Sequence, residues 1–241
     1  MRHVVVAKPT GLCFGVRRAI DRLENALRTE GTVYALGMPI HNPQEVERLS
    51  KIGAFVVEVP ADIPRGAKVF IRAHGISPDV YAELESKECD IIDGTCPFVK
   101  KAQDLARFLS EEGYHIVIVG DNDHPEVRAI RGCVSPGNVS VVSGAEEARS
   151  IGKFSRIGVI SQTTQKEECL AGVATSLVAF VDELRVFNTI CKATVERQQG
   201  IRELARNVDG VIVIGGRNSA NTGKLVDIVR SKNTDVLWIE H

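Results

Sequence analysis

The sequence predicts an α/β fold made of three pseudo-symmetric lobes, each with a mainly parallel sheet. Strand-like apolar runs alternate with helix-like periodic segments throughout the chain, which is the pattern of α/β folds. A unit led by a cysteine also occurs three times. With 241 residues, 44% of them hydrophobic, the chain can bury a large core. A repeated unit in a chain of this length favours three small lobes around one centre.

The second copy of the unit shows its parts most clearly. A strand-like run at 90–92 leads through a Gly-Thr turn to Cys96 and Pro97. Apolar residues then recur with helical spacing over 99–109, and Gly113 supplies a stop. Cys96 is therefore expected at the start of a helix, where the helix dipole and free N–H groups favour a thiolate. Such a thiolate is either a nucleophile or a metal ligand.

The first and third copies are led by Cys13 and Cys191, which precede helix-like segments that end at Gly31 and Gly210. A polar loop residue follows each of the three cysteines after 28 residues. These residues are His41, His124 and Ser219, and each comes after a strand-like run, at 33–36, 116–119 and 211–214 respectively. In all three copies the distance along the chain from the cysteine to the polar loop residue is the same, which indicates that the copies are equivalent.

Two copies continue with a further strand and a polar turn. The strands at 69–71 and 157–160 lead to His74 and Thr163, whereas the third copy stops after 236–239. We therefore predict two full modules of roughly 90 residues and a third that is about two-thirds complete.

The predicted lobes span 14–96, 97–187 and 188–241. The third is expected to be C-terminally incomplete and to be completed by residues 1–13, of which 1–7 are expected to form a strand. Extrapolation of the repeat gives a full chain of about 275 residues, so a shortened chain is expected.

Composition excludes several classes of protein. Charged residues make up 25% of the chain and the net charge is −1, without the basic patch of a nucleic-acid-binding protein. The expected strand at the start lacks the length of a signal peptide, and no apolar run approaches the length of a membrane span. We expect a cytoplasmic protein without membrane association, whose six cysteines are reduced, metal-bound or catalytic rather than disulfide-bonded.

The repeated cysteines predict a metal site with three sulfur ligands. Structural zinc normally takes a fourth protein ligand, whereas an iron–sulfur cluster with three cysteines leaves one iron open to substrate. A structural or sensory metal protein and a hydrolytic zinc enzyme stay open as alternatives to a redox enzyme. Cys89, Cys133 and Cys169 do not repeat and are interpreted as small buried hydrophobic residues.

Polar side chains gather in the loops that follow the strands: His41, His74, His124, Thr163, Thr164, Ser219 and Asn221. Ends of parallel strands are where α/β folds bind ligands, and these groups suit a phosphate or diphosphate. Glu126 is interpreted either as a charge at a helix start or as a general acid beside the metal. No G-x-G-x-x-G fingerprint occurs, so electrons are expected from a separate carrier.

With these residues in view, the chain resembles the 4-hydroxy-3-methylbut-2-enyl diphosphate reductase family, which catalyses the last step of the non-mevalonate isoprenoid pathway. The matching segments run the length of the chain. They are Gly11–Val16, Ile40–Asn42, Arg72–Gly75, Asp93–Pro97, His124–Val127, Ser161–Thr164, Asn188–Cys191 and Asn218–Asn221.

The resemblance implies a central [4Fe–4S] cluster, held by Cys13, Cys96 and Cys191 with one open iron. It implies a small allylic diphosphate substrate bound by His41, His74, His124, Thr163, Ser219 and Asn221, and Glu126 as the proton donor. The implied reaction is reductive dehydroxylation of (E)-4-hydroxy-3-methylbut-2-enyl diphosphate to isopentenyl diphosphate and dimethylallyl diphosphate, with ferredoxin or flavodoxin as electron donor. There are two departures: the family's further Ser-containing turn is not reached, and Ala220 stands where many members carry serine.

Overall fold

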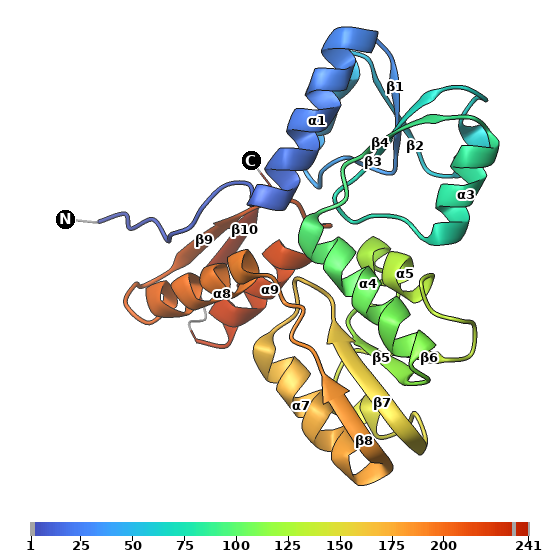
Figure 1. Cartoon of the computed structure of the whole chain (residues 1–241). Helices are drawn as coiled ribbons and strands as arrows, with labels where there is room; N and C mark the ends of the chain where they lie inside the picture. Colours follow the sequence, from blue (N-terminus) through green and yellow to red (C-terminus); the bar gives the residue numbers. More distant parts are fainter. Residues whose placement is uncertain (1–2, 233–234, 241) are drawn as a thin grey trace.

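The structure, a computed structural model, describes residues 3–232 and 235–240. Within these residues the strands form three separate sheets, and each sheet carries its own helices (Figure 1). All strand pairs in the described residues are parallel. The predicted α/β class with parallel sheets is therefore confirmed. We call each sheet with its helices a lobe.

The first lobe has a sheet in the order β2-β1-β3-β4. Its elements are α1 (Phe14–Glu30), β1 (Val33–Leu36), α2 (Pro43–Lys51), β2 (Ala54–Val57), η1 (Pro60–Asp62), β3 (Lys68–Ile71), α3 (Pro78–Ser86) and β4 (Asp90–Asp93). In α1, Leu23 and Leu27 lie four residues apart and pack with Val33 and Phe70 in one buried cluster. Gly31 ends the helix with a positive φ of 81°.

The second lobe repeats this topology in the order β6-β5-β7-β8. Its elements are α4 (Pro97–Glu111), β5 (His115–Val119), α5 (Pro125–Arg131), β6 (Val139–Val142), α6 (Ala145–Ala148), β7 (Phe154–Ser161), α7 (Glu167–Leu177), η2 (Val178–Phe180) and β8 (Val181–Val186). In the central strand β5, Ile116 and Ile118 pack on one face and Val117 and Val119 on the other. Both faces of the strand are buried, so it has an unbroken apolar run.

The third lobe contains α8 (Lys192–Ala205), β9 (Val211–Ile214), α9 (Ala220–Arg230) and β10 (Val236–Ile239). Its two described strands pair in the order β10-β9, as β2 pairs with β1 in the first lobe. Val211 and Val213 pack against α8 and α9, whereas Ile212 and Ile214 are exposed on the other face.

The predicted repeat coincides with the observed elements up to α9. Beyond it, β10 pairs with β9 as β2 and β6 pair with β1 and β5, so residues 236–239 are not the counterpart of the strands at 69–71 and 157–160, and this part of the prediction is wrong. Cys13, Cys96 and Cys191 are the N-cap residues of α1, α4 and α8. Each sheet lies within one of the predicted ranges 14–96, 97–187 and 188–241; the boundaries themselves stay predictions. No helix in the described part of the chain is long and apolar enough to cross a membrane.

The predicted N-terminal strand is wrong for residues 3–7, while Met1 and Arg2 lie outside the described residues. A strand needs a neighbour that satisfies its backbone hydrogen bonds, and no described strand pairs with 3–7. The segment that follows does contact the third lobe. Arg197 of α8 donates a 2.6 Å hydrogen bond to the Gly11 carbonyl, and Gly200 leaves room for the Lys8 carbonyl, which a Cβ would approach to 2.6 Å.

Candidate functional site

The three repeated cysteines meet where the lobes join. Figure 1 shows α1 and α4 beginning close together at this point. Gly15 lies against Cys96, because a Cβ at Gly15 would be 2.4 Å from the Cys96 Sγ. The Cys13 and Cys191 thiols both influence the Cys96 pKa through space. The structure therefore brings together the three thiols that the sequence predicted as one site.

Burial changes the expected protonation of Cys96. It raises the Cys96 pKa more than the backbone N–H groups of Phe98 and Val99 lower it, and the other two thiols raise it further. The N–H groups at the helix start thus lower the Cys96 pKa, as predicted. In the protein without a bound metal, however, desolvation raises this pKa by more. A bound cation would reverse this balance, because it stabilises thiolates.

Short contacts hold each cysteine in place. The Cys96 N–H donates to the Ala73 carbonyl at 2.9 Å, and the Cys191 N–H donates to the Thr163 carbonyl at 3.0 Å. The Cys191 Sγ also lies 3.0 Å from the Thr194 Oγ1. Cys96 is thereby tied to the turn that carries His74, and Cys191 to the turn that carries Thr163.

The donor set fits a metal cluster better than a single ion. Zinc gathers its ligands tightly around one ion, and no three His, Cys, Asp or Glu side chains in the described ranges are grouped in that way. Three thiols that interact through space from three helix starts suit a larger group of several irons. They fit the iron–sulfur cluster that the resemblance implies.

Replacing Gly15 with alanine is expected to reduce the iron and sulfide content after anaerobic reconstitution. The new Cβ would meet the Cys96 Sγ and displace a predicted ligand. Gly172→Ala in α7 is the matched control, because its Cβ would meet only the Ala145 Cβ at 3.9 Å. Equal cluster content in both variants would show that Cys96 can shift without loss of the site.

Three histidines form a second group. The ring centroids of His41 and His74 are 5.3 Å apart, and those of His74 and His124 are 5.1 Å apart. Both ring nitrogens of His41 and the Nδ1 of His74 are buried without a hydrogen-bond partner. The His124 Nδ1 accepts from the Glu126 N–H at 3.2 Å, which leaves its Nε2 to donate. Unpartnered buried polar atoms are costly, so this group is arranged for a ligand.

All three imidazoles are neutral at physiological pH. Burial is the largest cause: it lowers the pKa of His41, that of His74 well below its usual value, and that of His124 to about 4. Arg72 lowers the pKa of each of the three further. Neutral rings donate one N–H each, so they can bind phosphate oxygens without being charged themselves.

Arg72 was not among the predicted site residues, although it lies in a matching segment. It follows β3, its guanidinium fills the space beside Gly37, and its Nη1 is 3.5 Å from the Met38 carbonyl. It is partly buried, and burial lowers the pKa of its guanidinium, an effect that Glu58 opposes and Arg128 reinforces. An arginine at a strand end beside a predicted ligand histidine was the signal that could have identified it.

Glu126 lies in the first turn of α5 and is only 1% exposed. Its carboxyl group accepts from the Thr163 N–H at 2.6 Å and from the Thr163 Oγ1 at 2.8 Å. Burial raises the Glu126 pKa to about 7, against the lowering effect of these two hydrogen bonds. Because the Thr163 carbonyl also holds Cys191, the carboxyl group is joined to the thiol site through one residue.

The third lobe reaches the same region through the loop after β9. Gly216 abuts His41, since a Cβ there would lie 2.2 Å from the His41 carbonyl oxygen. Ser219 is the N-cap of α9 and accepts from the Thr222 N–H at 3.3 Å, and Asn221 follows in the first turn, partly buried. Arg217 instead stacks on Trp238 at 4.6 Å and is exposed.

The non-repeated cysteines lie elsewhere. Cys89, Cys133 and Cys169 are free and partly buried, and their Sγ atoms contact the carbonyls of Pro64, Ala129 and Ser143 respectively. Burial raises the pKa of Cys133 and Cys169. They are partly rather than fully buried, and Cys89 and Cys169 pack against hydrophobic clusters, so a structural role stays a prediction.

The fold and the site fit one class of protein: an α/β enzyme that brings three thiols, three neutral imidazoles and a buried carboxyl group to one centre. A family model described as "LytB protein" matches residues 4–241. The chain therefore belongs to the LytB family.

Curated relatives and solved structures agree with this assignment. The chain is 45% identical over 226 residues to a 4-hydroxy-3-methylbut-2-enyl diphosphate reductase of Geobacter metallireducens, covering 94% of this chain and 79% of the relative. It is 40% identical over 245 residues to the Aquifex aeolicus protein of the same name, covering 100% and 84%.

Two solved structures are similar. One is titled "Structure of (E)-4-Hydroxy-3-methyl-but-2-enyl Diphosphate Reductase, the Terminal Enzyme of the Non-Mevalonate Pathway", with a TM-score of 0.75, 40% identity and coverage of 98% and 85%. The other is the E-1-hydroxy-2-methyl-but-2-enyl-4-diphosphate reductase from Plasmodium falciparum, with a TM-score of 0.90, 27% identity and coverage of 97% and 74%.

Proposed function

We propose that this chain reduces (E)-4-hydroxy-3-methylbut-2-enyl diphosphate to isopentenyl diphosphate and dimethylallyl diphosphate, the last step of the non-mevalonate pathway. The observation that carries the proposal is the group of His41, His74 and His124, in which both ring nitrogens of His41 and the Nδ1 of His74 are buried without a partner and so suit a ligand. The names of the similar proteins support the same reaction.

Cys13, Cys96 and Cys191 are the residues that would hold a [4Fe–4S] cluster, with one iron free of protein ligands. When bound, the cluster would supply the two electrons of the reduction and a Lewis acid for the substrate hydroxyl. The chain's own residues position the substrate and handle its protons.

The diphosphate is bound by neutral donors. His41, His74 and His124 would direct N–H groups to its oxygens, and Ser219, Asn221 and Thr163 would add hydroxyl and amide groups. Arg72 lies close enough to lower the pKa of all three imidazoles, and its positive charge would partly balance the diphosphate. The group stays uncharged until the ligand enters, so no cation has to be buried unpaired beforehand.

Glu126 is the proton donor. The reaction breaks the allylic C–O bond, takes up two electrons, and adds one proton to the leaving oxygen and one to carbon, which releases water. Thr163 accepts or passes on the Glu126 proton, since its Oγ1 is 2.8 Å from the carboxyl group. A carboxyl with a pKa of about 7 is substantially protonated at neutral pH, as a general acid must be.

The electrons would come from ferredoxin or flavodoxin. The cytoplasm is the proposed location, since all six cysteines are free, as expected in a reducing compartment.

The decisive experiment is anaerobic turnover of the reconstituted protein with reduced methyl viologen as electron source. Formation of both product diphosphates would establish the function. A substrate-dependent change in the visible spectrum without product would instead indicate a sensor, and zinc in place of iron and sulfide would indicate a hydrolytic or structural zinc protein.

The viologen-driven rate is expected to fall as the pH rises through about 7. Only the protonated carboxyl of Glu126 can donate, and its pKa is about 7 in the folded protein. Initial rates measured at saturating substrate from about pH 6 to about pH 9 test this. Visible absorption at each pH controls for cluster loss, and a flat profile with an intact cluster would contradict the role of Glu126.

A further inference from the structure

Two phenylalanines beside the thiol site are exposed. Phe14 follows Cys13 and is 64% exposed, and Phe98 lies two residues after Cys96 and is 42% exposed. Large apolar side chains exposed beside a functional site mark interaction surfaces when they occur together. The contact between Gly15 and the Cys96 Sγ brings these two helix starts together.

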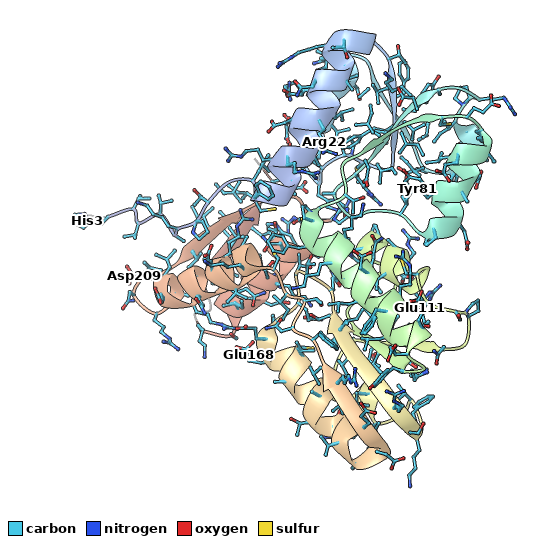
Figure 2. All side chains as sticks on the ribbon, viewed as in Figure 1. His3, Arg22, Tyr81, Glu111, Glu168 and Asp209 are labelled. Carbon is cyan, nitrogen blue, oxygen red and sulfur yellow. The ribbon has the colours of Figure 1, made fainter. Side chains whose placement is uncertain are left out.

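The start of α1 is tied to the segment that leads into α4. Arg18 of α1 donates to the Thr95 carbonyl at 3.1 Å, and Arg22 donates to the Asp93 carbonyl at 2.5 Å. Figure 2 labels Arg22 on α1 and Glu111 near the far end of α4. The two hydrogen bonds fix the start of α1 against the loop that carries Cys96.

The outer side of α4 adds a shallow groove of about 530 Å³. It is lined by Pro97, Lys100, Lys101, Asp104, Leu105 and Phe108. Apolar side chains thus lie between lysines, which is the composition of a docking surface with an apolar centre and a charged rim.

The exposed charges over residues 14–22 and 97–104, at the starts of α1 and α4, are mainly positive. Arg17, Arg22, Lys100 and Lys101 are exposed, and they outnumber the exposed acids Asp21 and Asp104. The Lys100 Nζ is 3.8 Å from the partly buried Asp93. The chain as a whole has a net charge of −1, so the positive excess is local.

We propose that this surface, which we call the α1–α4 face, docks a small acidic electron-carrier protein. The proposal rests on the proposed function, which needs two electrons in each turnover and a cluster that Cys13, Cys96 and Cys191 would hold. Redox encounters use small interfaces steered by opposite charge, and the lysines and arginines fit a negatively charged carrier. The phenylalanines supply the apolar contact at the point nearest the thiols.

The test compares the double variant Lys100→Glu, Lys101→Glu with Arg149→Glu, Lys153→Glu. The control pair makes the same change of charge at exposed residues between α6 and β7, at the strand-start edge of the second sheet. Phe98→Ser tests the apolar part. Reconstituted protein is titrated with an acidic ferredoxin and, separately, with a flavodoxin by calorimetry at low and at high salt, and turnover is measured with each carrier and with reduced methyl viologen.

The α4 double variant is expected to raise the Kd and the KM for the carrier by about tenfold or more at low salt, and Phe98→Ser by a smaller factor at both salt concentrations. Viologen-driven turnover and cluster content should equal those of the control. A change with only one carrier would identify the physiological type. Carrier affinity equal to the control's would overturn the docking proposal, whereas absence of viologen-driven turnover in the unchanged protein would overturn the proposed function and leave the calorimetric test valid.

Discussion

Serine in place of Cys13, Cys96 or Cys191 is expected to abolish or severely reduce the iron–sulfur cluster. The three thiols interact through space at the starts of α1, α4 and α8. A serine hydroxyl is not a thiolate, the ligand form that soft metal clusters require. The other three cysteines contact backbone carbonyls elsewhere, so in the described part of the chain no fourth thiol is at hand to replace a lost one.

Cys89→Ser, Cys133→Ser and Cys169→Ser are the matched controls, since these thiols contact backbone carbonyls away from the site. Iron and acid-labile sulfide per chain, with visible absorption, are measured after anaerobic reconstitution. Full cluster content in any one of the first three variants would remove that cysteine from the ligand set. Loss in a control variant would point to a fold defect, which circular dichroism of the apoprotein detects.

Glu126→Gln is expected to slow the reduction by about 10²–10⁴-fold while the cluster and substrate binding persist. The amide is nearly the same size, but it cannot deliver the proton that the leaving oxygen needs. Visible spectroscopy measures cluster content and substrate binding, and viologen-driven product formation measures the rate. The control is Glu45→Gln, which removes a carboxylate from the first turn of α2, where it pairs with Arg48 at 2.6 Å. If the Glu126→Gln rate is close to that of the control, Glu126 is not the proton donor and serves only as a charge at the start of the helix.

The same variant has a stability signature. The folded protein binds the Glu126 proton more tightly than the unfolded chain, because burial raises the pKa from 4.5 to about 7. The stabilising contribution is thus fully present below about pH 4.5 and is lost as the pH rises through 7. Melting of the apoprotein should therefore show a smaller fall in Tm between acidic and alkaline pH for Glu126→Gln. If Tm falls equally in the unchanged protein and in Glu126→Gln, the Glu126 carboxyl group is not desolvated in the way that the structure shows.

Local sequence patterns were enough to place most elements. Periodicity and turn chemistry act within a few residues, so the strands at 33–36, 211–214 and 236–239 and the helix over 99–109 were predictable. The repeated offset from cysteine to polar loop also identified equivalent positions, because a repeated topology brings equivalent positions to one centre. His124 and Ser219 are N-cap residues of α5 and α9, whereas His41 stands one residue before Asn42, the N-cap of α2.

The sequence by itself thus determined the α/β class, the repeat, and which cysteines and histidines share a centre. Only the tertiary structure decided that Glu126 pairs with Thr163, that Arg72 lies close to the imidazoles, and that residues 3–7 form no strand. It also decided the protonation of the Cys96 thiol and the Glu126 carboxyl, which helix-start reasoning placed on the ionised side. The physical reason is that desolvation depends on which distant segments bury a group, and strand pairing depends on which distant strand lies alongside. A local sequence pattern contains neither kind of information.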